Sequence, residues 1–137
     1  MSLMNVFGIN HSALVAQSTR INLIAENLAN ADVAAKSPEE VYKPKYPIFS
    51  TLMDASTADN QARGVTIEGI ATDDRAPRNE FNPGHAMADE NGFIYMPNVN
   101  PVQEMANMMG ASRAYQTNIE LMNSAKNLLM RTLTLGK

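Results

Sequence analysis

The stretch that decides the fold runs from Asn100 to Leu135 and reads NPVQEMANMMGASRAYQTNIELMNSAKNLLMRTLTL. It opens with a helix start signal, because Asn100 can cap the first turn and Pro101 suits the first helical position. No proline follows Pro101, and apolar residues then recur mostly three or four apart, which is the period of an α-helix. Such a helix would be about 50 Å long. A helix of that length needs packing partners along its whole length.

The polar positions of this stretch are mainly uncharged amides and hydroxyls. A lone surface helix normally carries many charges, whereas hydrogen-bonded neutral groups can be buried at modest cost. Five of the ten methionines of the chain also lie here, and methionine adapts to irregular neighbours. Ordinary core packing explains any single methionine equally well. For the whole set we expect a helix that other chains cover as well as its own.

A second helical stretch is predicted from about Asn5 to Ala31. Its apolar residues include four that stand seven apart, a coiled-coil-like register, namely Phe7, Leu14, Ile21 and Leu28. All seven prolines lie between Pro38 and Pro101, so both ends of the chain lack the commonest helix breaker. The simplest fold is mainly α: an antiparallel pair of long N- and C-terminal helices, capped by a Pro-rich loop and β-hairpin segment.

The middle of the chain is predicted to hold loops and short strands. We divide the chain into an N-terminal helix region over 1–33, a loop and β-hairpin insert over 34–99, and a C-terminal helix region over 100–137. Alternating or β-rich residues predict two short strands. Within the insert we expect, in order, an extended loop over Ala34–Phe49, a polar loop over Ser50–Arg63, a strand over Val65–Thr72, a turn-rich segment over Asp73–Gly84 and a strand over Phe93–Met96.

Composition limits the classes of function. The chain has 137 residues and a net charge of −3, which gives no electrostatic footprint for binding nucleic acid. It has no cysteine, and therefore no disulfide framework or thiolate metal site. No apolar run approaches the roughly 20 residues of a membrane span. Residues 1–8 lack the features of a secretory signal, so we expect any export to use a route without a cleaved leader.

Candidate chemical groups are few. His11 and His85 are the two histidines, and neither has a second ligand at metal spacing. The adjacent acids Asp73–Asp74 and Asp89–Glu90 read as solvated turns, because acid–base catalysis also needs a pocket and distinct environments. Gly110 inside the long helix indicates either a kink or the close approach of another backbone. We therefore predict no catalytic, cofactor-binding or metal site and no small-molecule substrate.

The two ends of the chain resemble a known family. Residues 12–32 and 100–135, with the runs AENLANAD and RAYQTNI, resemble the terminal helices shared by bacterial flagellar rod, hook and hook-associated axial proteins. Between them, NPGH at 82–85, ADENGF at 88–93 and MPNVN at 96–100 resemble a signature of the proximal rod proteins. The chain departs from the family at Glu26, where a second asparagine is common, and over Val33–Lys36, which has no glycine.

The resemblance implies a structural protein and not an enzyme: a subunit that polymerises helically in the proximal rod and transmits torque to the distal rod and hook. It implies a place in the basal body, in the rod that spans the periplasm, and export unfolded by the flagellar type III apparatus. The implied partners are copies of itself, other proximal rod proteins, the distal rod protein and the adaptor to the MS ring.

Three alternatives stay open: another flagellar rod protein, an export or assembly chaperone, and a small hydrolase. A chaperone would be expected to carry a more charged surface than these helices do, and a hydrolase needs a convergent polar site. For the rod reading we predict an assembly interface formed by the two terminal helices, consisting of Leu14, Ile21, Ile24, Asn27, Leu28, Asn30, Met105, Met109, Tyr115, Asn118, Ile119, Met122 and Leu129.

Overall fold

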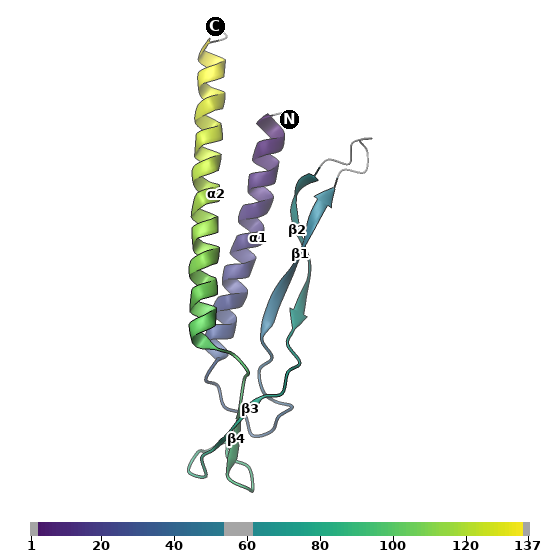
Figure 1. The fold of residues 1–137 in the computed structure, drawn as a ribbon, viewed down its shortest axis with the longest axis vertical. Coiled ribbons are helices and arrows are strands. Elements are labelled where there is room, and N and C mark those ends of the chain that lie inside the picture. The colour runs from purple at the N-terminus through teal and green to yellow at the C-terminus, as the bar shows by residue number, and fades with distance from the viewer. Residues whose placement is uncertain (1–2, 54–61, 136–137) are drawn as a thin grey trace.

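The computed structural model describes residues 3–53 and 62–135 of the chain. In chain order one long helix precedes the four strands and another follows them, and in space the two helices lie side by side and antiparallel (Figure 1). This arrangement confirms the predicted fold class. The elements, in chain order, are α1 (Leu3–Asn30), β1 (Lys45–Met53), β2 (Ala62–Thr72), β3 (Arg78–Phe81), β4 (Phe93–Met96) and α2 (Pro101–Leu135).

The contact between the helices is lined by small and branched apolar residues. Ala16 and Ile24 of α1 and Ala111 and Ala125 of α2 are buried, and alanine lets two helix backbones approach closely. The 35-residue α2 is longer than the 28-residue α1. Its C-terminal end therefore extends beyond the start of α1 (Figure 1), and nothing from α1 can cover it there.

Local signals set the inner ends of both helices. Asn100 caps α2, since its Oδ1 accepts hydrogen bonds from the backbone N–H groups of Val102 at 3.1 Å and Gln103 at 3.3 Å. The first residue of the helix is Pro101, as predicted. The last residue of α1 is Asn30, whose Nδ2 donates to the carbonyl of Glu26 at 2.8 Å. Both boundaries lie where the sequence indicated.

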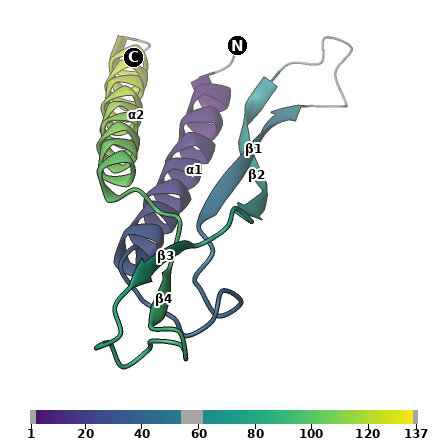
Figure 2. The same ribbon diagram turned by 60° about the horizontal axis from the view of Figure 1, so that its bottom comes forward.

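The strands β1 and β2 form a long antiparallel hairpin beside α1 (Figure 2). We predicted Ala34–Phe49 and Ser50–Arg63 as loops, and this was wrong for Lys45–Met53 and for the start of β2 at Ala62. Proline misled the prediction: Pro47 lies within β1 opposite Ile70, and an edge strand tolerates proline because only one of its sides forms the ladder. Residues 54–61 of the predicted loop lie outside the described residues.

Gly69 does not end the second strand, although it interrupts the apolar alternation. Ile48 pairs with Gly69 and Phe49 pairs with Ile67, so one residue of β2 is extra at this point. Such a bulge lets the strand continue with a local bend. The predicted strand over Val65–Thr72 is confirmed and extends further toward its N-terminal side.

The strands β3 and β4 form a second, shorter hairpin that caps the end of the molecule opposite the chain termini (Figure 1). The strand predicted at Phe93–Met96 is confirmed as β4. The segment Asp73–Gly84, predicted as turns, was partly wrong because it contains β3 at Arg78–Phe81. The loop after α1 is tied to this cap, since Ala35 and Tyr95 exchange two backbone hydrogen bonds of 2.8 and 3.1 Å.

Candidate assembly surface

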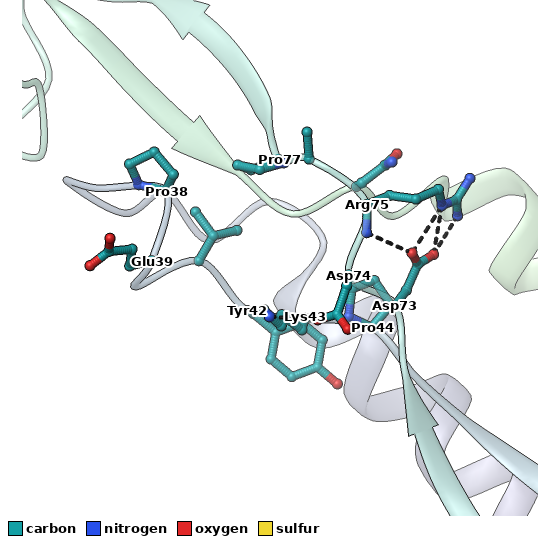
Figure 3. A pocket seen from close by; sticks show the side chains of 12 residues that line it. Pro38, Glu39, Tyr42, Lys43, Pro44, Asp73, Asp74, Arg75 and Pro77 are labelled. Carbon is teal, nitrogen blue, oxygen red and sulfur yellow. Dashed lines mark hydrogen bonds and ion pairs between the residues drawn. The ribbon is translucent and has the colours of Figure 1, made fainter.

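A hollow lined by several charged residues lies between the loop over 38–44 and the turn over 73–77 (Figure 3). It measures about 330 Å³. Arg75 binds Asp73 through Nη2 at 2.6 Å, and Lys43 Nζ binds Asp74 Oδ1 at 2.6 Å. The hydrogen bond from Arg75 lowers the pKa of the Asp73 carboxyl below its ordinary value. The Lys43–Asp74 pair joins the loop to the turn, whereas the Arg75–Asp73 pair lies within the turn, so both have a structural role.

The other acids and the two histidines that the sequence offered as candidate chemical groups do not form a shared site in the structure. Asp89 accepts hydrogen bonds from its own turn, first of all from the backbone N–H of Phe93, and its pKa is lowered as a result. His11 is exposed on α1, whereas His85 is exposed in the cap and accepts a bond from the N–H of Met87 at 3.1 Å. Among residues 3–53 and 62–135, no cluster of three His, Asp or Glu side chains could hold a metal ion.

A buried polar junction joins α1 to the hairpin. The side chain of Asn27 is fully buried and makes three hydrogen bonds. Its Oδ1 accepts from the N–H of Lys45 at 2.9 Å and from Tyr42 Oη at 2.8 Å, and its Nδ2 donates to the carbonyl of Lys45 at 2.9 Å. Burial, and then the nearby Glu26 charge, raise the pKa of Tyr42 to about 12. The phenol therefore stays protonated and can donate.

Glu104, on the first turn of α2, lies close enough to this junction for its charge to act on Tyr42. It is only 2% exposed, and its Oε1 accepts from Asn107 Nδ2 at 3.3 Å. Its Oε2 is buried and makes no hydrogen bond among the described residues. The partial positive charge at the start of a helix favours a carboxylate at this position. Glu104 and Asn27 thus place buried polar groups on both helices near the cap.

The residues of the predicted interface differ in how much surface they offer. Ile24 and Asn27 are buried, and the bonds of Asn27 are internal, so their positions do not support a contact with another chain. Met105, Met109 and Ile119 are exposed on α2. The remaining members are partly exposed, namely Leu14, Ile21, Leu28, Asn30, Tyr115, Asn118, Met122 and Leu129.

The outer surface of α2 mixes polar residues with several exposed large apolar ones. A shallow groove of about 460 Å³ is lined on one side of this helix by Met105, Met108, Met109, Ser112, Arg113 and Gln116. Gly110 lies nearby, and a Cβ added there would meet nothing within 4 Å, so no close approach occurs within the described chain. The helix also runs without interruption through Gly110. A single subunit therefore leaves this surface uncovered.

The cap carries a second apolar surface, which sequence reasoning missed. Phe81 and Phe93 are exposed, and their rings meet edge to face with centroids 5.3 Å apart. The sequence marked the turn before Phe93, but Phe81 lay in a segment predicted as irregular. Only the pairing of β3 with β4, in which these residues are register partners, brings the two rings together.

Comparison with known proteins places the chain in a family. It is 44% identical to the flagellar basal-body rod protein FlgC of Salmonella typhimurium over an alignment of 138 residues that covers all of both chains. The corresponding identities are 42% for FlgC of Yersinia enterocolitica and 39% for FlgC of Escherichia coli O6:H1, again over the whole of both chains. The chain belongs to the FlgC family of flagellar basal-body rod proteins.

A second comparison concerns the C-terminal third of the chain alone. The sequence family described as flagellar basal body rod FlgEFG protein C-terminal matches residues 90–135. This match takes in β4 of the cap and all of α2, the element with the most exposed apolar surface. Within residues 3–53 and 62–135 of this FlgC-family chain, neither helix is long and apolar enough to cross a membrane.

Proposed function

We propose that the chain is a structural subunit of the flagellar basal-body rod, which assembles helically with other flagellar components and transmits torque from the membrane ring to the distal rod and hook. One observation carries the proposal: α2 exposes eight large apolar residues, and exposed apolar surface of this extent marks a site of contact with other proteins. The eight residues are Val102, Met105, Met109, Ile119, Leu121, Leu128, Met130 and Leu133.

The proposed position in the rod and the proposed neighbours follow from family membership together with the exposed apolar residues of α2. The match to FlgC proteins supports the proximal part of the rod, with other proximal rod proteins, the distal rod protein and the adaptor to the MS ring as neighbours. Such a rod would span the periplasm, and the subunit would reach it through the flagellar type III apparatus without a cleaved signal. The two long helix regions, 1–33 and 100–137, would form the rod core, and 34–99 the insert.

The proposed role is mechanical and involves no catalysis. Four of the charged side chains that line the hollow form two ion pairs, and His11 lies on α1 whereas His85 lies between β3 and β4. We therefore expect His11→Ala and His85→Ala to leave swimming unchanged. A histidine variant that is exported and incorporated normally but cannot support swimming would contradict a purely structural role.

Electron microscopy of basal bodies isolated from the host tests the assignment directly. Cells lacking this chain should form no complete rod and should not swim, and the intact chain should restore both. In basal bodies, density that fits the antiparallel α1–α2 pair should lie inside the rod. A complete rod in cells that lack the chain would overturn the proposal.

A further inference from the structure

The cap contains the single Asn-Gly pair of the chain, Asn91–Gly92. Glycine has no Cβ to cover its backbone nitrogen, so this nitrogen can reach the side-chain carbonyl carbon of Asn91 more easily than the following nitrogen can at any other asparagine. Asn91 is exposed, and its side-chain amide makes no hydrogen bond within the described residues. These features favour deamidation, in which an asparagine loses its side-chain nitrogen as ammonia.

The fold requires glycine at position 92. Its φ angle is +83°, a backbone conformation that other residues rarely adopt. A Cβ at this position would also lie 3.0 Å from Phe81 Cε2 and 3.2 Å from Pro83 Cβ. A larger residue would therefore strain the backbone and displace the Phe81 ring. The cap thus depends on the one residue type that leaves Asn91 open to attack.

The folded cap protects the nitrogen of Gly92. Its N–H donates to the carbonyl of Asp89 at 3.0 Å, and Gly92 is buried although Asn91 beside it is exposed. Asp89 Oδ1 accepts from the N–H of Asn91 at 2.9 Å. The carbonyl of Gly92 accepts from the N–H of Asn82 at 2.9 Å. Attack on the Asn91 side chain requires the Gly92 nitrogen to leave its hydrogen bond and lose its proton to solvent, and the closed turn opposes both steps.

We propose that Asn91 is a latent modification site, which converts to aspartate or isoaspartate when the cap turn, residues 89–93, opens. Hydroxide takes the proton of the Gly92 nitrogen, which attacks Asn91 Cγ. The N–Cγ bond forms, the Cγ–Nδ2 bond breaks, and Nδ2 takes a proton from water and leaves as ammonia. Water then opens the resulting succinimide ring: addition at Cγ gives aspartate, whereas addition at the backbone carbonyl carbon gives isoaspartate. No atom is oxidised or reduced.

Either product changes the cap turn. Aspartate at position 91 adds a negative charge directly after Asp89 and Glu90. Isoaspartate adds one methylene to the main chain between the N–H groups of Asn91 and Phe93, which both donate to Asp89 Oδ1, at 2.9 and 2.8 Å. One carboxylate oxygen cannot then accept both bonds in the same geometry. Because Phe93 is the register partner of Phe81, we expect isoaspartate to disturb the pairing of β3 with β4.

The modified fraction would accumulate with the time that the chain spends with its cap turn open. Refolding does not restore the amide, because the ammonia has been lost to solvent. Local opening exposes the Gly92 nitrogen, and such an opening has its own free energy within a folded protein. The site therefore records how long the chain was open before the cap closed, and this holds whether or not the chain is assembled.

Deamidation of the full chain in buffer and in concentrated urea, at the same mildly alkaline pH, tests the site. Peptide mass spectrometry follows the replacement of the amide by a carboxyl group at each asparagine and distinguishes isoaspartate. In urea, Asn91 should convert faster than every other asparagine. In buffer it should convert at least about tenfold more slowly than in urea, because the turn must open first. Asn98 is the internal control, since it is equally exposed but precedes the buried, β-branched Val99.

Variants of the turn add a second measurement. Asp89→Ala removes the carboxylate that holds the turn, and it should raise the ratio of the rate in buffer to the rate in urea by about fivefold or more. Glu90→Ala removes the same charge from the adjacent exposed residue and should leave this ratio unchanged. In urea, where the strain of a Cβ at position 92 no longer matters, Gly92→Ala should slow the conversion of Asn91 severalfold.

Each outcome decides one part of the inference. Equal rates for Asn91 in buffer and in urea would overturn the protection by the cap turn, and so would an unchanged ratio in Asp89→Ala. Conversion of Asn98 as fast as that of Asn91 in urea would overturn the assignment of the site. None of these measurements involves the rod, so a failure here leaves the proposed function standing.

Discussion

The sequences of the two helices are alike in having a helical apolar pattern and few charges, but the two helices differ greatly in how much of their surface is buried. α1 packs against α2 on one side and against the β1–β2 hairpin on another, and Val15 is its one strongly exposed large apolar residue among those the structure describes. Among the described helices and strands, α2 packs against α1 alone, and eight large apolar residues of its described part are exposed, from Val102 to Leu133. The difference teaches that α1 is stabilised mostly within the subunit, whereas α2 depends on neighbours for much of its burial.

A charge placed in the buried face of α1 should have the largest effect. Ile24 is 4% exposed, and Ile24→Asp would bury an unpaired carboxylate, so we expect a loss of more than about 4 kcal/mol in the free energy of unfolding. Urea denaturation of the dilute chain, followed by circular dichroism, measures it. Ala25→Asp is the control, because Ala25 is exposed on the next position of the same helix. Equal losses in the two variants would show that α1 is not buried as described.

Removing the amide of Asn27 should have the next largest effect. Asn27→Ala leaves Tyr42 Oη and the backbone N–H and carbonyl of Lys45 without partners, and we expect a loss of about 3 kcal/mol in the free energy of unfolding. Asn22→Ala is matched for helix propensity at an exposed position of α1 and should cost nothing. A negligible effect at Asn27 would mean that the junction is hydrated in solution.

An added methyl group on α2 should have a smaller effect, and of opposite sign. Gly110→Ala should raise the free energy of unfolding of the isolated chain by about 1 kcal/mol, because glycine is a poor helix former and a Cβ there meets nothing within 4 Å. Gly8→Ala in α1 meets nothing either and serves as the control. If another backbone approaches Gly110 in the rod, only Gly110→Ala should reduce incorporation into basal bodies. Equal incorporation would argue against that approach.

A charge on the open face of α2 should affect the isolated chain least. Ile119 is 39% exposed, so Ile119→Asp should change the free energy of unfolding by less than about 0.5 kcal/mol. The same variant should block incorporation into the rod, because assembly would bury the carboxylate. Thr117→Asp provides an exposed control on the same helix. Normal swimming with Ile119→Asp would show that this face of α2 stays open in the rod.

The sequence predicted the helices and their caps because those signals are local. Asn100 bonds to residues two and three positions away, and Pro101 fixes the first turn by its own ring. The strand β1 could not be predicted in the same way, because Pro44 and Pro47 indicate a loop and the residues that pair with the strand lie in β2. The role of Asn27 was also hidden, since its partners are 15 and 18 residues away. We predicted Asn27 as a member of the assembly interface, and nothing in the sequence indicated these internal hydrogen bonds.

Hydrogen bonds attach the β1–β2 hairpin to α1 at two separate positions along the helix. Near one end, Ser12 Oγ accepts a hydrogen bond from the N–H of Val65 at 3.1 Å, and a Cβ on Gly64 would lie only 2.3 Å from that oxygen. Near the other end, Asn27 holds Lys45. The two fastenings are 15 residues apart along α1, or about 22 Å. A single attachment point would allow the hairpin to rotate relative to α1, whereas two attachment points restrict both its rotation and its translation along the helix. We therefore expect force applied along α1 to be shared between the two groups of hydrogen bonds, at Ser12 and at Asn27, instead of breaking them one after the other.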